Sequence, residues 1–396
     1  MKKSIKANIS WVGKVDWEIR NFHGYEYSTW KGTSYNSYLV QEGKTALIDT
    51  VWKPFAREFV DGLERDVGLD KIDFVIANHA EIDHSGALPE LLSRRPELPV
   101  YCTANGVKSL KGHYQGDWNF RTVKTGDTLN LGKKELVFIE APLLHWPDSM
   151  MCYLTGDAVV FSNDAFGQHY ATELLYNDMV DRDELYDEAI KYYANILTPF
   201  SPLVAKKIDE VVALKLPIDM ICPSHGVIWR TEPLQIVQQY AAWAKDYRED
   251  RISIIYDTMW DGTRRLAEAA AQGITEASPS TTVVLHNCSR SDKNDVITDV
   301  FRSKGVLFGS PTINRGILTA MAGLLEEIRG LRFKGKKAGA FGCYGWSGES
   351  PAMLAEAAKA AGFEVQGDAL KALWNPDDKA IAEAVEFGRS FVKKCT

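Results

Sequence analysis

Four potential metal ligands occupy six residues where an apolar run ends. The run Phe74–Asn78 reads as a buried strand, and His79, Glu81, Asp83 and His84 follow it directly. Neither a packed core nor a solvated face explains imidazoles and carboxylates at this density, so the cluster predicts a metal site. In an extended loop, side-chain alternation would send His79, Glu81 and Asp83 to one side, and a turn would bring His84 round to a second ion.

Three later residues complete a possible ligand set, and each stands where a strand is predicted to end. They are His145, Asp164 and His225. Segments this far apart in sequence converge only in a folded sheet. All seven residues together offer four imidazoles and three carboxylates, enough for two metals with a bridging carboxylate. Asp164 is the natural bridge, because it stands alone between the two late histidines.

The elements that must position these residues divide the chain into two parts. The first part alternates short strands with helices, typical of a mixed α/β layered structure with polar residues at strand ends. From Arg251 strands and helices alternate strictly, which predicts a doubly wound parallel sheet. We therefore expect two domains, residues 1–249 and 250–396.

Three loops of the second part follow neighbouring predicted strands, at the edge where parallel sheets bind ligands. The first loop offers hydroxyls and backbone N–H groups at a helix N-terminus, which together form a phosphate cradle. Glycines in the third loop permit close approach to a flat ring, which Tyr344 or Trp346 can stack on or screen. The candidate residues are Thr258, Met259, Trp260, Asp261, Gly262, Thr263, Ser310, Pro311, Thr312, Asn314, Gly342, Cys343, Tyr344, Gly345, Trp346, Ser347 and Gly348.

This second part resembles flavodoxin. The flavodoxin pattern T-x-T-G-x-T is kept at Thr258 and Thr263 and altered between them, and no GxGxxG suggests a dinucleotide. The resemblance implies FMN, with its single phosphate in the 258–263 loop.

The whole chain resembles the flavodiiron proteins, whose first domain has the metallo-β-lactamase fold. The motif H-x-E-x-D-H, with a late His, Asp and His in that order, carries the likeness. Hydrolases of that fold usually have a histidine where this chain has Glu81, and a carboxylate there favours iron over zinc. The resemblance implies one iron on His79, Glu81 and His145, a second on Asp83, His84 and His225, and Asp164 bridging. In some members the counterpart of His84 swings away and water replaces it.

The segments HWPDSM, FSNDAFGQHY, YYANI, YDTM and GWSGES resemble the catalytic core of the flavorubredoxins within that family. The family implies reduction of NO to nitrous oxide or of O2 to water, with electrons passing from FMN to the two irons. It also implies a head-to-tail homodimer, possibly a tetramer. No pair of cysteines suited to a rubredoxin module is present, so we expect a separate rubredoxin as electron donor.

The remaining histidines and the composition refine this picture. His23 and Tyr193 resemble family positions near the substrate pocket. Either could equally be a core residue whose polar atoms are hydrogen-bonded. His113, His169 and His286 are expected to be structural or on the surface.

The net charge of −7 argues against a nucleic-acid partner. Neither an 18-residue apolar run nor a secretory signal is found, so we expect no membrane contact and a cytoplasmic protein.

Two other interpretations stay open from the sequence. One is a zinc hydrolase with an added flavodoxin-like domain, which Glu81 and the flavin loops disfavour. The other is an electron carrier whose first domain is only a dimerisation scaffold, which the complete ligand set disfavours.

Overall fold

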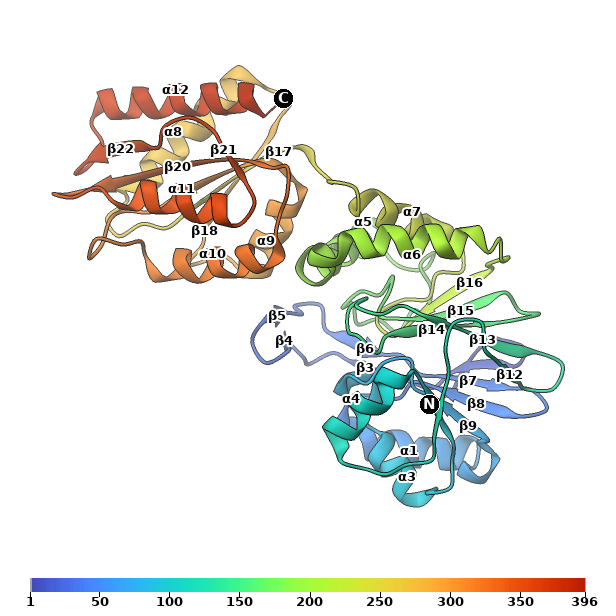
Figure 1. Ribbon diagram of the computed structural model, residues 1–396. Helices are drawn as coiled ribbons and strands as arrows, with labels where there is room; N and C mark the ends of the chain where they lie inside the picture. The colour runs from blue at the N-terminus through green and yellow to red at the C-terminus, as the bar shows by residue number, and fades with distance from the viewer. Residues whose placement is uncertain (1, 396) are drawn as a thin grey trace. The chain divides into compact units, whose positions relative to one another are not determined.

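The computed structural model describes residues 2–395 and divides into two compact units (Figure 1). The first comprises Met1–Tyr192 and Phe200–Ala242, and the second comprises Tyr193–Pro199 and Trp243–Thr396. The second unit therefore includes a short segment from within the first. The predicted boundary at residue 249 stays a prediction.

Two sheets face each other in the first unit. The seven-stranded sheet has the order β1-β2-β7-β8-β9-β10-β11 and the five-stranded sheet the order β12-β13-β14-β15-β16. Their apolar faces form one core, because alternate residues of each strand point to the opposing sheet. The strands are β1 (Lys3–Lys6), β2 (Ile9–Trp11), β7 (Tyr38–Gln41), β8 (Thr45–Ile48), β9 (Phe74–Ile76), β10 (Val100–Cys102), β11 (Phe120–Thr122), β12 (Thr128–Asn130), β13 (Glu135–Glu140), β14 (Met150–Leu154), β15 (Val159–Asn163) and β16 (Met220–Pro223).

Helices cover the outer faces of both sheets, which gives the αββα layering expected of the metallo-β-lactamase fold (Figure 1). Helix α1 buries Phe59, Val60 and Leu63 at the three- and four-residue spacing of an amphipathic helix. Two small hairpins, β3–β6 and β4–β5, lie outside the main sheets. The remaining bounds are α1 (Ala56–Asp66), α2 (Ile82–Ser85), α3 (Leu88–Arg94), α4 (Ala104–Tyr114), α5 (Arg182–Tyr192), α6 (Ser201–Ala213), α7 (Leu234–Trp243), β3 (Lys14–Asp16), β4 (Asn21–Phe22), β5 (Tyr27–Ser28) and β6 (Thr33–Tyr35).

The second unit contains a parallel sheet in the order β18-β17-β19-β20-β21, with β22 also paired to β20. Helices α8 and α12 lie on one face and α9, α10 and α11 on the other (Figure 1), so the doubly wound prediction is confirmed. The bounds are β17 (Glu249–Tyr256), α8 (Gly262–Ala277), β18 (Thr282–Asn287), α9 (Lys293–Arg302), β19 (Ser303–Gly309), α10 (Thr319–Leu331), β20 (Lys337–Tyr344), α11 (Ser350–Ala360), β21 (Glu364–Val365), β22 (Leu370–Leu373) and α12 (Asp378–Lys394).

The last strand differs from expectation. The sequence predicts one strand over 363–368, but the structure has a two-residue β21 followed by β22. Gly367 has a φ of +70°, a conformation that favours glycine and interrupts an extended strand.

Candidate diiron centre and flavin-binding loops

Four of the seven predicted ligands form one group in the first unit. His79, Glu81, His145 and Asp164 offer atoms that all lie within 4.8 Å of one another. The Oε2 atom of Glu81 is 3.3 Å from His79 Nε2 and 3.4 Å from His145 Nε2. Two imidazoles and a carboxylate therefore converge on one point, the donor set expected for the first metal.

The other three ligands form a second group beside the first. Asp83, His84 and His225 also offer atoms within 4.8 Å of one another. The Oδ2 atom of Asp83 is 3.2 Å from His84 Nε2 and 3.0 Å from His225 Nε2. His84 is buried and its ring points into the site, so in this structure it occupies a ligand position.

Asp164 joins the two groups through its two carboxylate oxygens. Its Oδ2 is 3.2 Å from His145 Nε2 and 3.7 Å from His79 Nε2. Its Oδ1 is 2.9 Å from His84 Nε2 and 3.5 Å from His225 Nε2. Each oxygen faces a different pair of histidines, which is the arrangement a bridging carboxylate requires.

The donor atoms suit metal ions better than they suit each other. Both oxygens of Asp164, Oδ1 of Asp83 and both ring nitrogens of His84 are buried without a hydrogen-bond partner among residues 2–395. Although Asp164 Oδ1 and His84 Nε2 are 2.9 Å apart, they lack the alignment of a hydrogen bond. Buried polar groups are rarely left unsatisfied, so atoms that converge in this way fit cations placed between them.

The electrostatics of the site favour the same conclusion. Burial would raise the pKa of the Asp164 carboxyl, but the imidazoles of His84 and His145 outweigh it and hold that pKa well below its usual range. Burial opposes protonation of His84, yet the carboxylates of Asp164 and Asp83 raise its pKa to about 9. The Asp164 carboxylate is thus anionic at neutral pH, and a metal would displace the proton from the His84 imidazole.

The ligands come from the ends of strands and from one short helix. His79 and Glu81 follow β9, Asp164 follows β15 and His225 follows β16. The predicted alternation within the first motif is wrong for Asp83, because the loop does not stay extended. Helix α2 begins at Ile82 and directs Asp83 to the second group together with His84.

Outer contacts hold two of the ligand histidines in different ways. His79 Nδ1 is 2.9 Å from Oδ2 of Asp148, a fully buried carboxylate that the sequence did not single out. His225 Nδ1 is 2.7 Å from the carbonyl oxygen of Ser34. In both cases the ring nitrogen facing away from the metal position donates its proton, which leaves Nε2 as the ligand atom.

His23 lies at the edge of the first metal group. Its Nε2 is 2.9 Å from Oε1 of Glu81, the oxygen that does not face His79 and His145. Burial disfavours the charged ring, but Glu81 outweighs it and raises the pKa of His23. The predicted location of His23 beside the site agrees with this contact, whereas its role stays a prediction.

The tyrosine that faces the site is Tyr192 rather than Tyr193. Tyr193 begins a π-helical turn, and its ring packs 5.5 Å from those of Trp243 and Phe301 in the second unit. The ring of Tyr192 lies 5.3 Å from that of His169. Successive helical residues point in different directions. Tyr192 therefore faces His169, whereas Tyr193, one residue later, faces Trp243 and Phe301.

His169 has the structural role expected of it, and the structure places it beside a ligand histidine. It is buried, its ring lies 4.8 Å from that of His225, and its Nδ1 is 2.8 Å from the Thr33 hydroxyl. Burial and the neighbouring His225 and His23 hold its pKa well below the usual range, so the ring is neutral. His169 therefore supports the ligand His225 by packing against it, a contact that only the fold reveals.

The first flavin loop carries two hydroxyls suited to a phosphate. The Oγ1 atoms of Thr258 and Thr263 are buried without a hydrogen-bond partner among residues 2–395. Both lie at the N-terminal end of the 16-residue helix α8, where backbone N–H groups and the helix dipole attract an anion. These orphan hydroxyls fit the phosphate of FMN.

The other two loops are tied together at the ends of β19 and β20. Thr312 N donates to the Cys343 carbonyl at 2.9 Å, and the Ser350 hydroxyl donates to the Ser310 carbonyl at 2.7 Å. A Cβ at Gly342 would lie 2.0 Å from the Ser310 carbonyl oxygen. The close approach requires glycine at 342. The Ser310 hydroxyl itself donates to the Pro311 carbonyl at 3.0 Å.

Aromatic side chains surround these loops on the outside. Trp260 is 90% exposed and Trp346 is 87% exposed, so neither is a core residue. The ring centroid of Trp374, a residue outside the predicted loops, lies 6.2 Å from that of Trp346. Trp374 follows β22, the fifth strand end at this edge of the sheet, and its N–H donates to the Tyr344 carbonyl.

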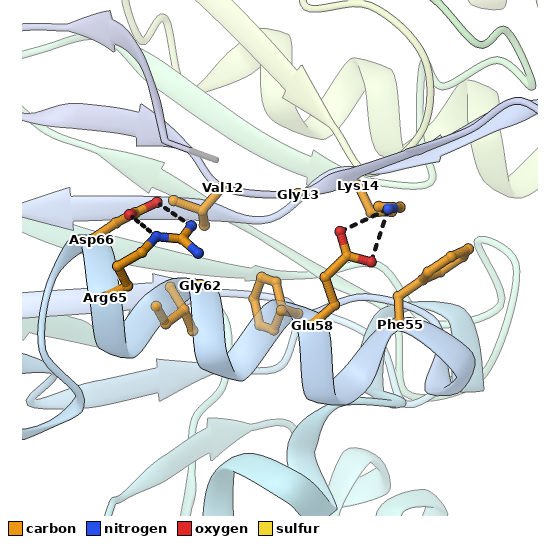
Figure 2. Close-up of a pocket in the computed structure, with 10 residues that line it drawn as sticks. Val12, Gly13, Lys14, Phe55, Glu58, Gly62, Arg65 and Asp66 are labelled. Carbon is orange, nitrogen blue, oxygen red and sulfur yellow. Dashed lines mark hydrogen bonds and ion pairs between the residues drawn. The ribbon is translucent and has the colours of Figure 1, made fainter.

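A separate hollow of about 240 Å³ lies between β3 and α1 (Figure 2). Lys14 and Glu58 pair at one end of it and Arg65 and Asp66 at the other. None of its lining residues is a candidate site residue.

Family models match both units. The model described as ODP family beta lactamase matches residues 33–226, and the flavodoxin model matches residues 254–388. Among curated proteins, the anaerobic nitric oxide reductase flavorubredoxins of Klebsiella pneumoniae and of an Enterobacter species are each 55% identical over 392 residues. The match covers 98% of this chain and 81% of each relative.

Solved structures match the whole chain. Rubredoxin oxygen:oxidoreductase from Desulfovibrio gigas has a TM-score of 0.96 at 34% identity, covering 100% of this chain and 98% of its own. The flavodiiron protein of Giardia intestinalis has a TM-score of 0.95 at 34% identity, covering 100% and 97%. The fold, the site and these matches define the protein as a two-domain oxidoreductase. It has a β-lactamase-like metal unit and a flavodoxin unit.

The chain belongs to the flavodiiron protein family. Its cofactors are accordingly FMN and a non-haem diiron site, in agreement with the two ligand groups and the flavodoxin unit. None of the helices within residues 2–395 has the length and apolar composition needed to cross a bilayer.

Proposed function

We propose that this chain is a flavodiiron reductase that converts nitric oxide to nitrous oxide and also reduces dioxygen to water. The observation that carries the proposal is the pair of ligand groups that share the carboxylate of Asp164. The relatives named anaerobic nitric oxide reductase flavorubredoxin support nitric oxide as the substrate.

The reaction needs two substrate molecules close together. Two NO, two electrons and two protons give one N2O and one water. Bound FMN would supply electrons one at a time from a two-electron store, and two irons held by the seven ligands would pass them to the substrate. Metal positions that share one carboxylate hold two diatomic molecules near each other, which lowers the entropic cost of forming the N–N bond.

Dioxygen is the second candidate substrate. Its reduction to two waters takes four electrons and four protons at the same two positions. The strong structural likeness to rubredoxin oxygen:oxidoreductase from Desulfovibrio gigas favours it. A metal-dependent hydrolase is the weaker alternative, because Glu81 places a carboxylate where zinc hydrolases of this fold have a histidine.

The residues of the chain divide the work. His79, Glu81 and His145 would hold one iron, Asp83, His84 and His225 the other, and Asp164 would bridge them. His23 would donate a hydrogen bond or a proton beside Glu81. Thr258 and Thr263 would hold the FMN phosphate, the loops at 310–314 and 342–348 would frame its ring, and Trp260 and Trp346 would lie beside it.

The electron donor and the assembly belong to the same proposal. We propose a cytoplasmic protein that receives electrons from a separate rubredoxin. Its diiron domain would span residues 1–249 and its FMN domain residues 250–396. It would form a head-to-tail homodimer, or a tetramer built from two such dimers, in which the FMN of one subunit serves the irons of the other. The exposed Trp260 and Trp346 offer apolar surface for such a contact. A fully active monomer by light scattering would contradict this assembly.

The test is anaerobic turnover with chemically reduced rubredoxin, measuring NO and O2 consumption on one preparation. We expect NO consumption to be faster. Equal or faster O2 consumption would make dioxygen the main substrate. Metal analysis gives the prior check: about two irons and one FMN per chain support the reductase, whereas zinc supports the hydrolase and flavin without metal supports an electron carrier.

A further inference from the structure

The two metal positions differ in what stands behind their histidines. At the first position, His79 faces a carboxylate, Asp148, across 2.9 Å. At the second, His225 faces the backbone carbonyl of Ser34 across 2.7 Å. The Nδ1 atom of His84, also at the second position, is buried without a partner among residues 2–395.

Asp148 is itself firmly held. Its side chain is fully buried, and Oδ2 also accepts from the Ala80 N–H at 2.7 Å. The Ser109 hydroxyl donates to Oδ1 at 3.3 Å. Asp148 lies three residues after His145, in the segment between β13 and β14. One segment therefore supplies a ligand directly and orients a second ligand of the same metal.

These contacts have unequal effects on the ligands. An anionic acceptor at Nδ1 makes Nε2 a stronger donor than a neutral carbonyl does, and it also fixes the ring orientation. An imidazole whose Nδ1 has no acceptor lacks both effects. Glu81, at the first position, is additionally held by His23 at 2.9 Å, whereas Oδ1 of Asp83 has no such partner.

We propose that Asp148 is a positioning residue that makes the His79–Glu81–His145 position the more tightly held of the two. The Asp83–His84–His225 position then loses its iron first. This inference rests on the diiron part of the proposed function and adds an order of metal loss, which is independent of which diatomic molecule is the substrate.

The experiment challenges the iron-loaded holoenzyme with a chelator and follows iron per chain with time. We expect two phases in the natural protein. Anomalous scattering from crystals of half-depleted protein should locate the retained iron at His79, Glu81 and His145. In Asp148→Asn the amide keeps the side-chain shape but loses the charge, and the slow phase should accelerate about 10- to 100-fold, the range for losing an outer-shell partner.

Asp157→Asn is the matched control. Asp157 lies in the turn between β14 and β15, and its carboxylate pairs with Lys134. It contacts none of the ligands. This variant should keep both phases. Unchanged circular dichroism and thermal unfolding of both variants, measured before the chelator is added, would show that their metal units fold. Retention of iron at Asp83, His84 and His225 in half-depleted protein, or an unchanged slow phase in Asp148→Asn, would overturn the proposal. Because iron retention needs no turnover, a failure to reduce NO or O2 would not affect this result.

Discussion

The two units bury charge in opposite ways. In the metal unit, the buried oxygens of Asp164 and the buried nitrogens of His84 have no hydrogen-bond partner among residues 2–395. In the flavodoxin unit, the buried ammonium of Lys336 donates to three carbonyls, those of Tyr247 at 2.9 Å, Phe301 at 2.6 Å and Ser303 at 2.8 Å.

This difference shows what each unit needs from outside. A lysine ammonium has three N–H donors, and the chain's own backbone satisfies all three at Lys336. In the metal unit, by contrast, the buried ligand atoms of Asp164 and His84 face one another without hydrogen bonds. The charge balance of that unit therefore depends on bound cations. Changes in one unit should therefore affect metal content and changes in the other flavin content or stability, with little crossover.

The largest expected effect is at the shared carboxylate. Among residues 2–395, the Asp164 carboxylate is the one that contacts histidines of both groups, and Asp164→Ala removes it. We expect both irons to be lost and turnover to fall by more than about a hundredfold, beyond the usual cost of losing an outer-shell partner. Iron analysis and NO consumption measure this, and flavin absorbance should be unchanged. Retention of two irons per chain would show that Asp164 does not bridge.

Gly342→Ala should break the flavin half alone. The added methyl would lie 2.0 Å from the Ser310 carbonyl, so the loops after β19 and β20 must separate. Overpacking of this kind costs about 1–3 kcal/mol, which corresponds to FMN binding weakened by about tenfold to a hundredfold. Titration of the apoflavin protein with FMN measures the change.

The control for this variant is Gly323→Ala in α10, where no atom lies within 4 Å of the new methyl. It should bind FMN normally, and both variants should keep two irons. If both Gly342→Ala and Gly323→Ala weakened FMN binding, the cause would be a general disturbance of the domain and not the separation of the two loops.

Lys336→Met tests the internally satisfied charge. The substitution leaves three buried carbonyls without their donor, at an expected cost of about 1–3 kcal/mol in the free energy of unfolding. Urea denaturation followed by flavin release measures it. The adjacent Lys337, which pairs with Glu364 at the surface, gives the control Lys337→Met with a change of at most about 1 kcal/mol. Equal effects of the two substitutions would contradict the special role of Lys336.

The sequence predicted the metal site better than its surroundings, for a physical reason. Ligand residues are chemically distinctive and cluster at strand ends, so His79 and Asp164 stand out even without a structure. Supporting residues are recognisable only by what they touch. Asp148 reads as a loop carboxylate and His169 as an isolated histidine until the fold places each against a ligand.

Local geometry accounts for the remaining differences. The one-residue exchange between Tyr192 and Tyr193 depends on the π-helical turn that begins there, which no periodicity predicts. In the same way, helix α2 was not foreseen, and it is this helix that assigns Asp83 to the second metal. Strand and helix alternation, in contrast, predicts a layered α/β first part and a doubly wound second part. The metallo-β-lactamase fold of the first part was inferred from the family resemblance.

The smallest expected effect comes from His23, which contacts a ligand without being one. His23→Gln keeps a donor within reach of Glu81 Oε1 but removes the ring that can give up a proton. We expect two irons per chain and a turnover lowered by about tenfold, the lower end for an outer-shell partner. If His23 only positions Glu81, Gln should restore the rate that His23→Ala loses, whereas a proton donor would leave both variants equally slow. The ratio of the two rates thus separates positioning from proton transfer.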